Sequence, residues 1–367
     1  MVKIEPRPHS SQVMQNASPL LAIMLTVLSG FVLFAALGKD PVRAMLLIFV
    51  EPLTSVFSVT ELLIKASPLM IIASGLALCF RAGVWNIGAE GQFSIGALVG
   101  GAVALALYEV EGLWVLPFIC VAGAIGGMTW ACIPALLRTR FHTNEILVSL
   151  MLVYVANLLL SYLVHGPLRD PDGQNFPESR LFHDAAILPI LVEDTRLHIG
   201  IVISLIAAVL AWIILHRHRI GFEIRVLGQS ARAARFAGFS ETRIVWFCLL
   251  ASGGLAGLAG VFEATGPVGQ LVPALPVGYG FTAIIVAFLG RLSPVGVVLA
   301  SLLLALTYIG GETAQIAMNL PSATTQVFQG LLLFYLLAAD ILIKYRVRFT
   351  PFRAHRGETS SSAARTG

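Results

Sequence analysis

The chain has 367 residues, of which 57% are hydrophobic and only 12% are charged, and its mean hydropathy is +0.85. Soluble globular proteins carry about 25% charged residues, so this composition excludes a soluble domain and predicts that most residues face lipid or other apolar helices. The formal net charge is +4, but no basic stripe with interleaved aromatic residues is present, and we expect no nucleic-acid partner.

Apolar runs near bilayer length predict an all-α, polytopic membrane protein with about ten transmembrane helices. A span needs about 17–25 residues, so the run at 276–290 is short and is expected to be tilted, broken or re-entrant. Residues 41–59 are interrupted by Arg43, Glu51 and Pro52, which favours an interfacial or re-entrant segment. Ten spans divide into five plus five, which would place the second half in inverted topology. The ten runs are 20–38, 61–80, 93–110, 113–136, 145–165, 198–216, 244–264, 276–290, 294–312 and 322–343.

Lysine and arginine are distributed unevenly between the loops on the two sides of these spans. If the N-terminus is inside, 18 of the 24 basic residues are cytoplasmic and 5 are outside, while Lys65 lies within a span. By the positive-inside rule both termini are therefore predicted to be cytoplasmic. The expected organisation is a cytoplasmic tail at 1–19, a transmembrane domain at 20–343 with an outer loop at 166–197 and an interior loop at 217–243, and a basic, disordered tail at 344–367.

A Gly-rich polar segment, FRAGVWNIGAEGQ at 80–92, separates the second and third predicted spans. Non-helical backbone persists at membrane depth only where protein buries it or where it lines a wet cavity. The segment is therefore either a loop at the membrane face or part of a pathway, in which case Arg81 marks the interface and residues 86–92 fold back inward. Four of its side chains need polar partners: Arg81, Asn86, Glu90 and Gln92.

The interior loop contains a short predicted helix with a signal at each end. Ser230 is a good N-cap, residues 231–237 are good helix formers, and Gly238 fits the position that follows a helix. Arg232 and Arg235 share one face. Two turns of helix are marginal in water, so we expect this helix to dock on a soluble partner. The alternative is a basic loop that contacts lipid headgroups.

Two groups of small residues predict faces where helices approach closely. Residues 252–260, SGGLAGLAG, place small side chains along one helix, and Gly96, Gly100, Gly123 and Gly127 repeat the small-xxx-small spacing. We expect these glycines to serve close packing without a role in substrate binding.

Several stretches together resemble one family. FRAGVWNIGAEGQ is followed by TNEILVSLM, HGPLRDP, GFEIRVLGQSARAARFAG and GYGFTAIIVAFLGRLSPVGVVLA. In this order they resemble the permease subunits of bacterial ABC importers of the branched-chain amino acid and ribose superfamily, and most closely the branch associated with purine nucleoside uptake. The resemblance covers about residues 41–343. The chain departs from that branch at Trp85, where Phe is common, and at Phe288, in a stretch usually rich in Ala or Leu.

The resemblance implies a set of partners in the bacterial cytoplasmic (inner) membrane. A second permease subunit would complete the pathway as a heterodimer, a cytoplasmic ABC ATPase would drive it, and a periplasmic or lipoprotein binding protein would deliver the substrate. The helix near 230–238 would be the coupling helix that contacts the ATPase. The chain has no GxxxxGK[ST] phosphate loop, so ATP and Mg would be bound by the ATPase. We expect this subunit to bind no cofactor or metal and not to be an enzyme.

Polar residues within or beside the spans are candidates for the substrate pathway. A nucleoside needs amide and hydroxyl partners and a stacking ring, whereas Glu90 and Glu145 could instead be partners for Arg81 or for helix N-termini. A sugar or another small solute is the alternative substrate. An ion-coupled secondary transporter, with Glu263 as the coupling carboxylate, is a weaker alternative because it has no need of a docking helix. The candidates are Asn86, Glu90, Gln92, Asn144, Glu145, Tyr279, Phe281 and Gln326.

Overall fold

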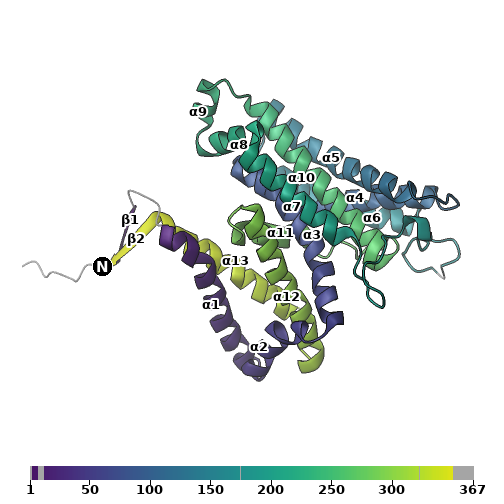
Figure 1. The fold of residues 1–367 in the computed structure, drawn as a ribbon, viewed down its shortest axis with the longest axis horizontal. Helices are drawn as coiled ribbons and strands as arrows, with labels where there is room; N and C mark the ends of the chain where they lie inside the picture. The colour runs from purple at the N-terminus through teal and green to yellow at the C-terminus, as the bar shows by residue number, and fades with distance from the viewer. Residues whose placement is uncertain (1, 7–11, 174, 322, 350–367) are drawn as a thin grey trace, which may run out of the picture. The chain divides into compact units, whose positions relative to one another are not determined.

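The computed structural model describes residues 2–6, 12–173, 175–321 and 323–349, and most of them are helical (Figure 1). The chain divides into two compact units, one formed by Met1–Leu28 with Leu331–Gly367 and the other by Ser29–Gly330. The helices are α1 Gln12–Ala36, α2 Pro41–Phe49, α3 Val56–Arg81, α4 Ala89–Ala106, α5 Val115–Phe141, α6 Glu145–His165, α7 Gly200–Arg217, α8 Arg219–Gln229, α9 Ala231–Phe236, α10 Glu241–Glu263, α11 Tyr279–Leu289, α12 Pro294–Met318 and α13 Ala323–Lys344.

Each of the ten predicted apolar runs falls on a helix. Within the described ranges, seven helices are long and apolar enough to cross a membrane, namely α3, α4, α5, α6, α7, α12 and α10 with its continuation to Val268. Three shorter apolar helical segments, Leu20–Ala36, Tyr279–Leu289 and Gln326–Leu336, match the first, eighth and tenth runs. The chain is therefore a mostly helical, multi-pass membrane protein. The count of ten, the inverted repeat and the orientation stay predictions.

The two segments that the sequence marks as unusual form short helices. α11 has 11 residues, which at 1.5 Å per residue is about half the thickness of the hydrocarbon core. It follows a π-helical turn at Ala264–Val268 and a non-helical stretch, so the run at 276–290 forms one short helix that is separated from α10 by an interruption of the helix. α2 has 9 residues and is capped by Asp40, whose Oδ1 accepts a hydrogen bond from the Val42 N–H at 2.9 Å. It is also too short to span.

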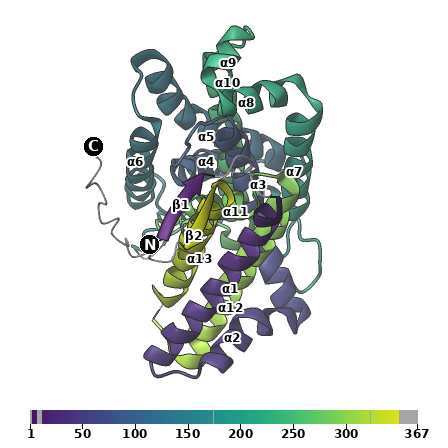
Figure 2. The same cartoon turned by 90° about the vertical axis from the view of Figure 1, so that its left-hand side faces the viewer.

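Helices α4, α5 and α10 pack backbone against backbone at the centre of the larger unit, and α6 and α7 lie on opposite flanks (Figure 2). A Cβ atom built on Gly96 would lie 2.1 Å from the Gly257 Cα, and one on Gly127 would lie 2.1 Å from the Gly253 carbonyl oxygen. No larger residue fits without movement of the backbone. The prediction that these glycines form close packing faces is confirmed.

The interior loop at 217–243 is more helical than expected. Besides α9, it contains α8, which the sequence analysis did not predict. α8 buries Gly221, Ile224 and Leu227 along one face, and its outward side carries Arg219, Arg225 and the exposed Phe222. Gly228 fixes α8 to the end of α3, because a Cβ atom there would lie 1.9 Å from the Arg81 carbonyl oxygen.

A second difference is a pair of short strands, β1 Val2–Pro6 and β2 Tyr345–Phe349, in a chain predicted to be all-α. They pair antiparallel with Val2 opposite Phe349. Residues 345–349, YRVRF, alternate apolar and basic side chains with the period of a strand, so this pattern outweighs the charge of the segment, which alone predicts a disordered tail. The rest of the predicted disordered tail, 350–367, lies outside the described residues.

The outer loop at 166–197 folds over the end of α10. The Phe182 N–H donates to the Gly269 carbonyl at 2.8 Å, and the Leu188 N–H donates to the Thr265 carbonyl at 2.9 Å. His198 follows this loop and is buried, with its Nδ1 accepting a hydrogen bond from the Gly200 N–H at 3.1 Å.

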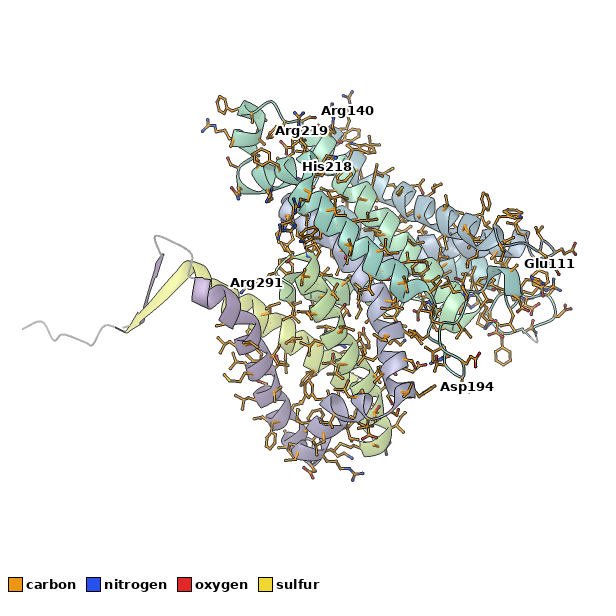
Figure 3. The ribbon with its side chains drawn as sticks, in the orientation of Figure 1. Glu111, Arg140, Asp194, His218, Arg219 and Arg291 are labelled. Carbon is orange, nitrogen blue, oxygen red and sulfur yellow. The ribbon has the colours of Figure 1, made fainter. Side chains whose placement is uncertain are left out.

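Charged side chains differ between the two ends of the larger unit. Arg140, His218 and Arg219 gather at the end that carries α8 and α9, whereas Glu111 and Asp194 lie on the opposite side (Figure 3).

Candidate functional site

The polar segment after α3 folds back into the bundle. The chain turns at Gly83, which has a φ of 71°, and returns to place Asn86 fully buried. The Asn86 amide donates to Ser252 Oγ at 3.0 Å and to Gln92 Oε1 at 2.9 Å, and the Gln92 amide donates back to Asn86 Oδ1 at 3.1 Å. Ser252 lies in the middle of α10, so Asn86 and Gln92 sit well inside the helical bundle and bond to each other and to the protein.

Glu90 holds the N-terminus of the short helix α11. Its two carboxylate oxygens accept hydrogen bonds from the backbone N–H groups of Gly278, at 2.7 Å, and of Gly280. Gly278 has a φ of 94°, and a Cβ atom on Gly280 would lie 2.2 Å from the Glu90 nitrogen. Both glycines are therefore required for this approach. The expectation that Glu90 is a partner for a helix N-terminus agrees with the structure, and the carboxylate neutralises the positive end of the helix dipole.

Tyr279, the first residue of α11, belongs to an intramembrane polar cluster. Its hydroxyl accepts a hydrogen bond from Lys65 Nζ at 2.8 Å and donates to Glu263 Oε1 at 3.2 Å. Lys65 and Glu263 form an ion pair with an N···O distance of 3.9 Å. Three helices, α3, α10 and α11, thus meet at one tyrosine hydroxyl.

The other pathway candidates are divided between this region and the surface. Glu145 is paired with Arg138 rather than with Arg81, at an N···O distance of 2.5 Å, and its Oε1 also accepts from the Trp85 N–H at 3.4 Å. Asn144 caps α6 by accepting from the Ile146 N–H at 2.9 Å. The structure therefore brings together Asn86, Glu90, Gln92 and Tyr279, with Glu145 beside them, whereas the side chains of Asn144, Phe281 and Gln326 are exposed and form no hydrogen bond or ion pair with this group within the described chain.

The two residues at which the chain departs from the nucleoside branch contact each other. The ring centroids of Trp85 and Phe288 are 6.0 Å apart, and Phe80 lies 5.3 Å from Trp85 and 5.1 Å from Phe288. Sequence alone gives two unrelated departures, but the structure joins them in one aromatic cluster.

The predicted docking helix exists and has both expected caps. Ser230 Oγ accepts a hydrogen bond from the Ala233 N–H at 3.2 Å at the start of α9. Gly238 follows the helix with a φ of 77°, and the Phe239 N–H donates to the Ala234 carbonyl at 2.9 Å. Arg232 and Arg235 are both exposed. Phe236 is 87% exposed, an apolar side chain on this helix that the sequence analysis did not single out.

Three residues of the site were missed by reasoning from the sequence. Lys65 was noted only as a charge inside a span, although an intramembrane ionisable residue is itself a signal of function. Ser252 was assigned to a packing face, and Arg138 was counted as a loop charge. The partners of Lys65 and Ser252 lie 214 and 166 residues away in the chain, so no local pattern identifies these two pairings. The partner of Arg138, Glu145, is only seven residues away, and opposite charges at that separation are a signal available in the sequence.

Comparison with known proteins agrees with this architecture. The sequence model of the family described as "Branched-chain amino acid transport system / permease component" matches residues 58–337. The glucose ABC transporter permease protein TsgB13 of Haloferax volcanii is 38% identical over 94% of this chain and 93% of its own length. The guanosine ABC transporter permease protein NupP of Bacillus subtilis is 30% identical over 90% of this chain and 94% of its own. The nucleoside ABC transporter permease protein NupB of Lactococcus lactis subsp. cremoris is 28% identical over 88% and 91%. The chain belongs to the family of permease components typified by branched-chain amino acid transport systems, and it is an ABC transporter permease.

Proposed function

We propose that this chain is one permease subunit of an ABC importer in the bacterial cytoplasmic membrane, and that it forms half of the pathway for a small, neutral, polar solute. A nucleoside or purine is the first candidate and a sugar the second. The relatives support both, because NupP and NupB are named for guanosine and nucleosides and TsgB13 is named for glucose.

The proposal that the solute is neutral rests on the position of Glu90. In many transporters, the N-terminus of a broken helix points its free N–H groups at an anionic group of the substrate. Here a carboxylate of the protein already accepts from the Gly278 and Gly280 N–H groups. A substrate carboxylate at the same place would be repelled by Glu90 and would find fewer donors. This favours a nucleoside or a sugar over an amino acid.

We infer that α9 is the coupling helix. Its two arginines and Phe236 extend away from the bundle without covering by the described part of the chain, as expected of a surface that a cytoplasmic ATPase completes. ATP binding would close the ATPase dimer, displace α9 and change the relative stability of the outward- and inward-facing states. ATP and Mg are assigned to that ATPase. A second permease, a binding protein and the lipid bilayer complete the proposed set of partners.

The ion-coupled alternative depends on Glu263, and the geometry disfavours it. Glu263 is buried beside the Lys65 ammonium and accepts a hydrogen bond from Tyr279. A carboxylate already neutralised by a protein cation has little affinity left for a coupling cation.

The test is reconstitution of the chain with its ATPase, a second permease and the binding protein in vesicles. Uptake of guanosine or glucose should require ATP and loaded binding protein, and uptake that follows an ion gradient without ATP would refute the importer. Replacing both Arg232 and Arg235 by Glu, or Gly238 by Pro, should leave insertion of the chain into the membrane intact but uncouple ATP hydrolysis from solute uptake. Proline cannot adopt the φ of 77° at position 238. Arg169→Glu, an exposed substitution in the outer loop, is the matched control.

A further inference from the structure

Lys65 stands out because α3 is otherwise almost completely enclosed. From Thr60 to Phe80 every side chain is buried except Leu63 and Lys65, and the Lys65 side chain is 23% exposed. Lys65 follows the first residue of α3 by nine positions, about 14 Å along the helix axis. A charged group at this depth faces other helices or water, because exposure to lipid is costly.

Within the described part of the chain, Lys65 uses only one of its hydrogen-bond donors. An ammonium group has three N–H donors, and Lys65 Nζ gives one of them to the Tyr279 hydroxyl at 2.8 Å. The nearest Glu263 oxygen is 3.9 Å away, too far for a second hydrogen bond. Tyr279 is fully buried and the Glu263 side chain is only 8% exposed. These two buried residues thus hold the ammonium from one side, and the 23% exposure of the Lys65 side chain leaves it accessible from another.

A half-buried aromatic ring borders the same cluster. Tyr308 of α12 lies with its ring centroid 6.3 Å from that of Tyr279, and its hydroxyl is hydrogen-bonded to Thr282 Oγ1 at 3.1 Å. A fixed donor beside an aromatic ring suits a ligand with hydroxyl groups on an apolar ring. Glu90 occupies the nearby α11 N-terminus, so an anionic ligand is not favoured there.

Resting on the proposed function, we propose that Lys65 donates hydrogen bonds to the neighbouring hydroxyl groups of a ribose or hexose ring as the solute passes the start of α11. Tyr279 and Glu263 are positioning residues that hold the ammonium. A nucleoside and a sugar both present neighbouring hydroxyl groups. Recognition of those groups explains how one permease architecture could transport either kind of solute. A purely structural ion pair is a poor explanation, because apolar residues of similar volume stabilise such a position as well or better.

The test measures uptake by the full complex in vesicles for two pairs of solutes, guanosine with 2′,3′-dideoxyguanosine and glucose with 2-deoxyglucose. The same binding protein is used throughout, so a change in the ratio of kcat/KM values within a pair reports on the permease alone. Lys65→Met should reduce the preference for the hydroxylated member by about tenfold or more, the effect of one hydrogen bond to a charged group. Lys65→Arg should restore most of it. The pair that responds identifies the source of the hydroxyl groups.

Two further measurements distinguish loss of a hydrogen bond to the solute from misfolding of the Lys65 variants. Tyr279→Phe retains the ring but releases the ammonium, so it should lower the same ratio less than Lys65→Met. In Lys65→Cys, a small water-soluble thiol reagent should react above the background of the native cysteines, and solute should slow the reaction. ATP-driven uptake with an unchanged ratio, or a cysteine that never reacts, would overturn this role and leave the importer intact. Absence of ATP-driven uptake in the unmodified complex would overturn both.

Discussion

Glu90→Gln isolates the interaction that holds α11 in place. The Glu90 carboxylate accepts two backbone N–H groups, those of Gly278 and Gly280, and hydrogen bonds to charged groups contribute about 1.5–3 kcal/mol each. A glutamine of the same shape can accept one of them through its carbonyl, but its NH₂ group then faces the second N–H. One charged bond becomes neutral and one donor is left unsatisfied, so we expect the free energy of unfolding to fall by about 2–4 kcal/mol.

The assay is unfolding of the purified protein in detergent, followed together with ATP-driven uptake by the complex. Glu111→Gln, on an exposed loop at the opposite end from α8 and α9, is the control and should change the free energy of unfolding by less than about 0.5 kcal/mol. Glu90→Ala, which leaves both N–H groups without a partner, should be more damaging than Glu90→Gln. Stability of Glu90→Gln equal to the control would refute the capping role and, with it, the argument for a neutral solute.

Two further predictions concern packing and pH. Gly96→Ala should destabilise the protein by about 1–3 kcal/mol, because its Cβ would lie 2.1 Å from the Gly257 Cα, whereas Gly330→Ala has nothing within 4 Å and should be neutral or stabilising in the same unfolding assay. Burial lowers the pKa of His198 to about 4, below the ordinary value of about 6.5 in the unfolded chain. The contribution of neutral His198 to the free energy of unfolding is therefore fully present above about pH 6.5. The free energy of unfolding then falls by about 1.4 kcal/mol per pH unit as the pH decreases toward 4. His198→Gln should remove that slope, exposed His165→Gln should not, and an unchanged slope in His198→Gln would contradict the assignment.

Much of the fold follows from patterns within single segments. Continuous apolar runs locate the helices, Ser230 and Gly238 mark the two ends of α9, and the shortness of 276–290 indicates a segment that is not a regular full-length span. Each of these depends on neighbours in the chain, which hydropathy and capping describe well. The β1–β2 pair joins the two ends of the described chain, and no property of either end alone indicates the other.

The candidate site is predictable in its members but not in its connections. Sequence reasoning selects Asn86, Glu90, Gln92 and Tyr279 because polar groups in apolar surroundings need partners. Which partners they find depends on crossings between distant helices. Glu90 meets Gly278, 188 residues away. Glu145 pairs with Arg138, seven residues before it, and not with Arg81, the cation expected from the sequence. Asn144 is selected by the same rule, but its need is met locally by capping α6.

The contact between Gly228 and the Arg81 carbonyl has a mechanical consequence. Side chains can absorb a displacement by changing rotamer, but two backbones in contact have no such slack. A displacement of α8 should therefore be passed directly to the end of α3. Gly75, on which a Cβ would lie 2.8 Å from the Ser252 Cα, joins α3 to α10, and the Gly96–Gly257 contact joins α10 to α4. Relative movement within the subunit must then occur between helices that pack through larger side chains. The rigidity of these glycine contacts therefore determines how large a helix displacement at one end of the subunit results from a small displacement at the other end.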